Sequence, residues 1–307
     1  MAHHMPDYHH AVEVSCGRID LVYYLGRRPL VLLIHGNSAC KEIFAAQISL
    51  LREQGYGVLA LDLPGHGASE NAKNPSAVYS FPGYAGIVAE ILDFFAIESI
   101  HVVGWSLGGH VGLELMGRDA RVASLLIVGT PAAKMRMESL AEAFLPSGAM
   151  NYAGQRDFSL EDAIAYGEAV VGGPEFLTPD LLKAVRRTDG DARFWMVQNA
   201  MNGLGLDEWD LAERDVRPLA VLHGDKDPFI NLAYLRKPAY RNLWRGAVQV
   251  LEGVGHAAHW QAPDQFNELL LSFLQEVSGE LSPGEAAVEQ IGGGGGGATW
   301  RPILKIF

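Results

Sequence analysis

The stretch GWSLGGHVG, residues 104–112, decides the fold. It continues the apolar run IHVVG, residues 100–104, and leads into a segment with helical spacing. Ser106 stands between Gly104 and Gly108, which is the G-x-S-x-G pattern of a sharp strand–turn–helix elbow. An ordinary turn with a serine cap gives the same letters, so the remaining sequence has to decide whether Ser106 is a nucleophile.

Apolar runs alternate with helical patterns on both sides of this elbow. Continuous apolar runs are typical of strands that are buried on both faces of a parallel sheet. We therefore predict an α/β fold, with a mostly parallel sheet covered by helices on both faces. The predicted strands include 29–36, 57–67, 99–105, 122–130, 217–224 and 247–253, and the predicted helices between and after them are 42–54, 81–97, 106–118 and 262–277.

The alternation stops after residue 130 and resumes near residue 214. The intervening segment contains short helical patterns, at 132–144, 160–171, 178–187 and 192–201. We interpret 1–130 and 214–278 as the core and 131–213 as a helical cap above the carboxyl ends of the strands, where open α/β sheets bind ligands. Residues 279–307 read as a flexible Gly-rich linker and a tail, compatible with a tag, a frameshifted segment or a docking peptide.

A serine nucleophile needs a histidine base and an acid that orients this base, in the chain order Ser, acid, His. Asp225 and Asp227 follow one predicted strand, and His256 and His259 follow the next. We favour Asp227, whose backbone the next residue, a proline, restrains, and we expect Asp225 to cap the turn. We favour His256 because it comes directly after the strand, and we expect His259 to be partly exposed. Ser106, Asp227 and His256 are thus the predicted catalytic residues.

The oxyanion of such a reaction needs two backbone N–H donors. One is expected from Leu107, directly after the nucleophile, and the other from Asn37 in the loop HGNSA, residues 35–39. The same loop is compatible with a plain turn in which Ser38 caps the following helix. Both roles can coexist, because they use different atoms.

Composition narrows the class of partner. The 307 residues carry a formal net charge of -12, with 49% apolar and 20% charged residues, which is typical of a globular protein with a sizeable core. The negative charge disfavours nucleic acid and anionic membrane surfaces, so a small neutral molecule is the expected partner. Cys16 and Cys40 form no C-x-x-C pair, and the sequence shows neither a signal peptide nor a spanning apolar run. We expect a cytoplasmic protein.

Taken together, these stretches resemble the α/β-hydrolase superfamily. The matching pieces, within about residues 12–277, are HGNSA, DLPGHGAS, GWSLGGHVG, GDKDPF and GVGHAAHWQAPDQF. The resemblance implies the α/β-hydrolase fold with an inserted helical cap. Because this fold hosts many reactions, the substrate has to be argued from the site.

A narrower resemblance is to the metal-independent N-acyl-homoserine lactonases of this fold, carried mainly by RTDG in residues 187–190 and NLW in residues 242–244. It implies hydrolysis of the lactone ring of a small molecule, an N-acyl-homoserine lactone, with no metal and no cofactor. The sequence leaves the choice between a monomer and a homodimer open. It also implies substrate contacts from Gly36, Trp105 and Tyr166, although packing within the cap explains Tyr166 equally well. One departure is that this group can carry Glu as the triad acid, where this chain has the shorter Asp227.

Other activities stay open at this point. A general carboxylesterase or an enol-lactone hydrolase is the main alternative, and an acylase that cleaves the side-chain amide of the same substrate is another. Haloalkane dehalogenases and epoxide hydrolases of this fold place Asp at the nucleophile position, so Ser106 argues against both. A catalytically inactive receptor is disfavoured by the intact set of serine, acid and histidine.

Overall fold

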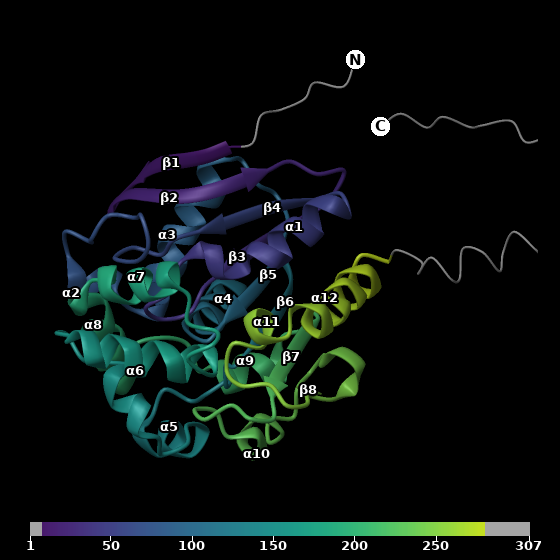
Figure 1. Cartoon of the computed structure of the whole chain (residues 1–307). Helices are drawn as coiled ribbons and strands as arrows, with labels where there is room; N and C mark the ends of the chain where they lie inside the picture. Colours follow the sequence, from purple (N-terminus) through teal and green to yellow (C-terminus); the bar gives the residue numbers. More distant parts are fainter. Residues whose placement is uncertain (1–7, 280–307) are drawn as a thin grey trace, which may run out of the picture.

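Eight strands form one sheet in the computed structural model, which describes residues 8–279 of the chain (Figure 1). Their order is β1-β2-β4-β3-β5-β6-β7-β8; β1 and β2 pair antiparallel at one edge, β2 is antiparallel to β4, and the remaining pairs are parallel. The strands are β1 (Tyr8–Val14), β2 (Gly17–Tyr24), β3 (Arg28–Ile34), β4 (Tyr56–Leu61), β5 (Ile100–Trp105), β6 (Val122–Val128), β7 (Leu219–Gly224) and β8 (Gln249–Leu251). The prediction of a mostly parallel α/β sheet is confirmed.

Helices cover both faces of this sheet. Across the sheet, the connection from β3 to β4 runs in one direction, whereas the connections from β4 to β5 and from β5 to β6 run in the other. Because these crossovers are right-handed, α1 lies on the face opposite α3 and α4. Helix α12 packs beside α1, and α9 packs against α4 (Figure 1). These helices are α1 (Ala45–Glu53), α3 (Phe81–Phe94), α4 (Leu107–Arg118), α9 (Glu208–Arg214) and α12 (Pro263–Val277).

The strand order reverses between β3 and β5, and this reversal marks the ligand-binding edge of an open α/β sheet. The register aligns Ile34 of β3 with Gly104 of β5, and Trp105 with Val128 of β6. The loops after β3, β5 and β6 therefore leave the sheet at the same edge. Between β7 and β8 the register aligns Gly224 with Leu251, so the loops after these two strands join the others there.

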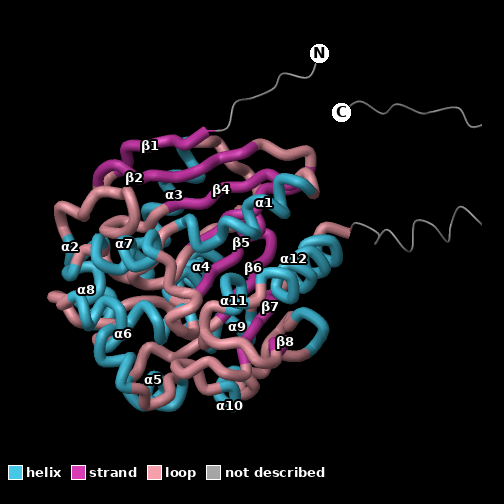
Figure 2. Tube along the Cα trace, viewed as in Figure 1, coloured by secondary structure: helices cyan, strands magenta, loops and turns pink. Residues whose placement is uncertain are grey.

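The chain between β6 and β7 forms a separate group of helices beyond this edge (Figure 2). We call α5 to α8 the inserted helices: α5 (Met137–Ala143), α6 (Leu160–Val171), α7 (Pro179–Arg187) and α8 (Gly190–Met201). Short helical turns complete the structure: η1 (Lys41–Phe44), α2 (Pro75–Val78), η2 (Gly148–Tyr152), α10 (Leu232–Leu235), η3 (Trp244–Gly246) and α11 (Ala258–Gln261). Within residues 8–279, every helix is too short or too polar to cross a membrane. The predicted tail, 279–307, lies almost wholly outside the described residues.

Candidate active site

Ser106 lies in a strained turn between β5 and α4. Its φ of 52° and ψ of -117° are rarely adopted by residues other than glycine. The neighbouring glycines are required because any larger residue would clash. A Cβ atom on Gly104 would lie 2.3 Å from the carbonyl oxygen of Gly108, and one on Gly108 would lie 2.0 Å from a backbone oxygen at the end of β3. A Cβ atom on Gly109 would lie 2.1 Å from Oγ1 of Thr130. The packing of the elbow therefore explains the glycines of the opening motif.

His256 and Asp227 form a hydrogen-bonded pair at the carboxyl edge of the sheet. Nδ1 of His256 lies 2.8 Å from Oδ2 of Asp227. The other carboxylate oxygen, Oδ1, accepts hydrogen bonds from the backbone N–H groups of Phe229 at 2.8 Å and Ile230 at 3.2 Å. Because Nδ1 donates to the carboxylate, Nε2 is the ring nitrogen of His256 that is left for chemistry.

The surroundings of Asp227 keep its carboxyl group ionised. Burial acts to raise the pKa of Asp227, but His256, the Phe229 N–H and the nearby His223 outweigh burial and hold this pKa below its ordinary value. Asp225 has a different place: its carboxylate accepts the backbone N–H of Gly253 at 2.6 Å and ties the loop after β8 to the end of β7. That contact fits the turn-fixing role expected for Asp225.

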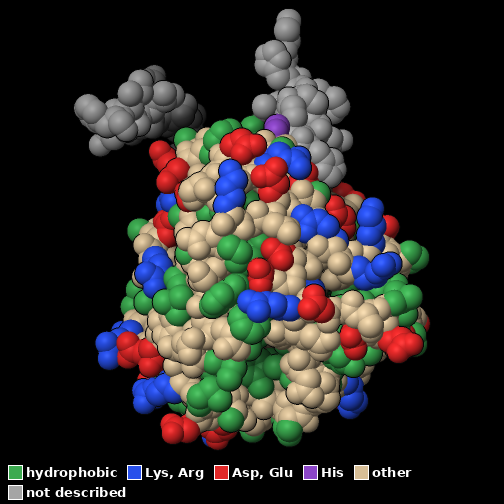
Figure 3. All heavy atoms as spheres, turned by 90° about the vertical axis from the view of Figure 1, so that its left-hand side faces the viewer, with side chains coloured by type: hydrophobic (Ala, Val, Ile, Leu, Met, Phe, Trp, Pro, Cys, Tyr) green, Lys and Arg blue, Asp and Glu red, His purple; other side chains and the backbone are tan. Residues whose placement is uncertain are grey.

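A cavity of about 300 Å³ lies between this edge of the sheet and the inserted helices. Apolar side chains make up most of its wall, with methionine prominent among them: Met137, Met150, Met196 and Met201. Met137 and Met201 are 55% and 43% exposed, so the cavity meets solvent between the start of α5 and the end of α8. Figure 3, in which the left-hand side of Figure 1 faces the viewer, shows hydrophobic side chains around a hollow in the lower half of the molecule. The cavity is suited to a flexible apolar group.

Five of the predicted site residues meet at this cavity, namely Asn37, Ser106, Leu107, Tyr166 and His256, and Asp227 reaches it through His256. The Asn37 amide donates to the carbonyl oxygen of Ala153 at 2.9 Å and to the Tyr166 hydroxyl at 3.2 Å, which joins the loop after β3 to the inserted helices. In the described part of the chain, no acceptor is found for the backbone N–H groups of Asn37 and Leu107.

Gly36 and Trp105 do not line this cavity, so their contact with substrate stays a prediction. Trp105 is buried behind the site and donates its indole N–H to the carbonyl oxygen of His256 at 3.0 Å. A Cβ atom on Gly36 would lie 2.8 Å from the Trp105 ring. Both residues thus support the loop that carries His256.

Two expectations for single residues are wrong. His259 was expected to be partly exposed, but it is fully buried; its ring stacks on Phe44 at 4.6 Å and lies 4.9 Å from the Trp105 ring. Ser38 does not cap a helix: η1 begins at Lys41, and the Ser38 hydroxyl donates to Oδ1 of Asn37 at 3.3 Å. The helical turn begins at Lys41, close to the predicted start at residue 42, so Ser38 lies too far before it to be its cap.

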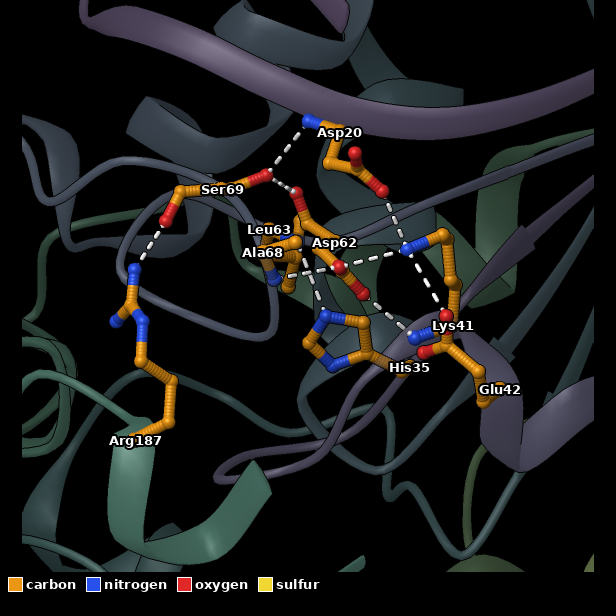
Figure 4. Close-up of polar contacts among 9 residues, drawn as sticks. All are labelled: Asp20, His35, Lys41, Glu42, Asp62, Leu63, Ala68, Ser69 and Arg187. Carbon is orange, nitrogen blue, oxygen red and sulfur yellow. Dashed lines mark hydrogen bonds and ion pairs between the residues drawn. The ribbon is translucent and has the colours of Figure 1, made fainter. Parts of the chain in front are cut away.

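An ion-pair cluster centred on Lys41 fixes the loop between β3 and η1 (Figure 4). Nζ of Lys41 lies 2.5 Å from Oδ1 of Asp20, 2.9 Å from Oδ2 of Asp62 and 3.0 Å from Oε1 of Glu42. The backbone N–H of Lys41 also donates to Asp62, at 2.7 Å. His35, at the start of the loop, accepts the Leu63 N–H through Nε2 at 2.9 Å, and burial lowers the pKa of His35, which keeps the ring neutral. The position of Asn37 is therefore set by buried contacts on both sides.

A second histidine–carboxylate pair, His110 and Glu208, lies at the cavity and was not predicted from the sequence. His110 lines the cavity, and its Nδ1 lies 2.8 and 2.9 Å from the two carboxylate oxygens of Glu208. A signal for His110 was present, because it stands four residues after Ser106 in the opening motif. Glu208 gave no such signal, since it lies 98 residues after His110 in the sequence and stands in an acidic segment.

Comparison with known proteins places this geometry in a family. Residues 31–269 match the model of the alpha/beta hydrolase family. A crystal structure of the N-acyl homoserine lactonase AidH complexed with N-butanoyl homoserine is similar, with a TM-score of 0.85 and 36% identity over 90% of this chain and 98% of that one. An esterase from Exiguobacterium antarcticum shares the fold, with a TM-score of 0.69 and 18% identity over 87% of this chain and 100% of that one. A putative non-heme chloroperoxidase of Synechocystis sp. is 26% identical over 86% of this chain and 98% of its own length. The chain belongs to the alpha/beta hydrolase family.

Proposed function

We propose that this hydrolase of carboxylic ester bonds opens the lactone ring of N-acyl-homoserine lactones, with Ser106, His256 and Asp227 as its catalytic triad. The observation that carries the proposal is the His256–Asp227 pair, which faces the same apolar cavity as the strained Ser106. The likeness to the lactonase AidH, at 36% identity, supports the substrate class. The cavity wall suits an acyl chain, because it is apolar and rich in flexible methionine.

The first step is attack by the serine. Nε2 of His256 removes the proton of the Ser106 hydroxyl as Oγ attacks the ring carbonyl carbon. The carbonyl oxygen becomes an oxyanion, which the free backbone N–H groups of Asn37 and Leu107 stabilise. The start of α4 adds a favourable field, since its N-terminal end is positive. Asp227 holds the His256 ring and stabilises the imidazolium that forms.

The ring then opens and water releases the product. His256 returns its proton to the ring oxygen as the C–O bond breaks, which leaves an acyl-enzyme whose acyl group still carries the new alcohol. Water, deprotonated by His256, attacks this ester, and Ser106 leaves with a proton from His256. The product is the open-chain hydroxy acid. In this reaction the inserted helices act as the cap that shapes the acyl-chain site.

The test is to incubate the protein with N-octanoyl-homoserine lactone and to identify the products by mass spectrometry. We expect a product heavier by one water that closes again to the lactone in acid, and no product with the Ser106→Ala variant. Release of octanoic acid and homoserine lactone would instead indicate an acylase that uses the same triad. Turnover of p-nitrophenyl acetate without turnover of the lactone would indicate a general esterase.

A further inference from the structure

The cavity holds a polar side chain, His110, that the proposed mechanism does not use. The polar lining residues are Asn37, Ser106, His110, Tyr166 and His256. The steps above use neither Tyr166 nor His110, but the Tyr166 hydroxyl is already bonded by the Asn37 amide. His110 lies on α4 one turn after the nucleophile, since its backbone N–H lies 3.3 Å from the carbonyl oxygen of Ser106. Side chains at this spacing are roughly 6 Å apart.

The His110 ring is held on two sides. Its Nδ1 donates to both carboxylate oxygens of Glu208, at 2.8 and 2.9 Å. Glu208 is fully buried and also accepts the backbone N–H of Ala133 at 3.1 Å, so the carboxylate is fixed in turn. One face of the ring stacks on Phe81, with the ring centres 4.5 Å apart and the planes 3° from parallel.

The contacts of the His110 ring determine which of its two nitrogens is available to a ligand in the cavity. Because Nδ1 points to Glu208, Nε2 lies on the opposite side of the ring, and His110 is a lining residue of the cavity. No residue in the range 8–279 is found as a hydrogen-bond partner of Nε2. A rigid imidazole with one free nitrogen thus stands in an otherwise apolar part of the wall, beside Phe81, Leu140 and Phe144.

We infer that His110 is a specificity-determining residue, whose Nε2 hydrogen-bonds a hydroxyl group on the acyl chain of the substrate. A hydroxyl fits either protonation state of the ring, because it donates to neutral Nε2 and accepts from protonated Nε2. In an N-acyl-homoserine lactone, the third carbon of the acyl chain lies about as far from the ring carbonyl as His110 lies from Ser106. The inference rests on the proposed function for this choice of substrate class.

The experiment compares two ligands that differ by that hydroxyl alone. Dissociation constants of N-octanoyl- and N-(3-hydroxyoctanoyl)-homoserine lactone are measured by calorimetry with the Ser106→Ala protein, which holds the ligand without turnover. One hydrogen bond is worth about 0.5–1.5 kcal/mol, so we expect the hydroxylated lactone to bind about twofold to twelvefold more tightly. Turnover of the unsubstituted lactone by the unaltered protein is measured in parallel.

Two substitutions of His110 separate the ring nitrogens. Asparagine places its amide nitrogen near the position of Nδ1 and has nothing at the position of Nε2, so His110→Asn retains a donor for Glu208 and removes the proposed contact. Glutamine reaches the position of Nε2, so His110→Gln retains part of it. We expect the preference for the hydroxylated lactone to be lost with His110→Asn and partly kept with His110→Gln.

Glu114→Gln is the matched control. Glu114 lies on α4, the helix that carries His110, and it is fully buried, as Glu208 is. It accepts hydrogen bonds from Arg118 and Leu206 and does not line the cavity. This substitution removes a buried carboxylate that acts on Glu208 but leaves the His110 ring in place, so we expect the ratio of dissociation constants to be unchanged.

The two proposals fail in different ways. Equal affinities for both lactones, with turnover of the unsubstituted one, would overturn the role of His110 and leave the lactonase. A preference that disappears with His110→Asn, without turnover by the unaltered protein, would support His110 and overturn the lactonase. If neither lactone binds, both proposals are wrong.

Discussion

Two histidine–carboxylate pairs face one cavity, yet the pKa values of their carboxyl groups shift in opposite directions. Asp227 pairs with His256, and Glu208 pairs with His110, each through Nδ1 at 2.8 Å. Burial acts to raise the pKa of both carboxyl groups. Nevertheless the pKa of Asp227 lies below its ordinary value, whereas the pKa of Glu208 lies above.

The difference comes from the groups around each carboxylate. Asp227 accepts two backbone N–H groups besides its histidine, and His223 lies near it. Glu208 accepts a single backbone N–H, and the negative charge of Glu114 disfavours its ionised form. A histidine partner alone therefore does not set the direction of the pKa shift of a buried carboxyl group; the other N–H donors and the charges around it also contribute. In the proposed mechanism it is the carboxylate of the first pair, with its lowered pKa, that stabilises an imidazolium.

The largest expected effect is on the base of the first pair. His256→Gln removes the group that accepts the Ser106 proton, so we expect kcat for p-nitrophenyl acetate to fall by about 10⁴- to 10⁶-fold. Stopped-flow and steady-state assays on the purified variant measure it, with circular dichroism as the check on folding. Retention of more than a tenth of the activity would mean that another group is the base.

The next effect separates the two carboxyl groups. Asp227→Asn keeps the size of the side chain but loses the charge that stabilises the His256 imidazolium, and we expect kcat to fall by about 10⁴-fold. Glu208→Gln is the matched change in the other pair, and we expect less than about a tenfold fall for an unsubstituted ester, since Glu208 reaches the cavity only through His110. Equal losses from the two variants would contradict the assignment of Asp227 as the triad acid.

A third buried histidine shows what happens with no carboxylate partner. Both ring nitrogens of His259 lack a hydrogen-bond partner in the described residues, and burial, with the charge of His256, lowers the pKa of His259 to about 3. The unfolded chain binds this proton below a pH of about 6.5, whereas the folded chain does not, so stability is lost as the pH falls from about 6.5 towards 3.

His259→Leu removes this acid sensitivity. Each pH unit in that window costs about 1.4 kcal/mol, so between pH 7 and pH 5 we expect the variant to lose about 2 kcal/mol less unfolding free energy than the unaltered protein. Urea unfolding at both pH values measures the difference. Parallel loss of stability in the two proteins would show that His259 is protonated in the folded state.

Most of the core could be predicted because its strands are buried on both faces. Strands β4, β5 and β7 are buried at every position, and each appears in the sequence as a mainly apolar run. Helix α6 was predicted at its observed bounds, 160–171, where Ser159 and Asp162 form a capping box at its start. Local signals and burial agree in these elements.

The features that were not predicted from the sequence share a physical cause: polar residues are buried there by specific partners. Helix α9 was not predicted, because Glu208 reads as a surface residue and only its bonds to His110 and Ala133 explain its burial. His259 was misjudged for the same reason, since stacking against Phe44 cannot be read from spacing. The residues that motif spacing selected, Ser106, Asp227 and His256, lie at one edge of the sheet. For the second pair, the sequence held a signal for His110 but none for Glu208.

The smallest expected effect concerns a link that belongs to neither pair. Tyr166 on α6 accepts a hydrogen bond from the Asn37 amide at 3.2 Å, and burial raises the pKa of Tyr166 to about 12, so its hydroxyl stays neutral. Tyr166→Phe removes this bond and retains the ring. Because Asn37 also donates to Ala153, its loop keeps one anchor on the segment between α5 and α6. We expect kcat/KM for the lactone to fall by about twofold to twelvefold, as one hydrogen bond of about 0.5–1.5 kcal/mol is lost. A fall of 10³-fold or more would mean that the Tyr166 hydroxyl acts on the substrate itself, and a third polar group would then join the two pairs in the reaction.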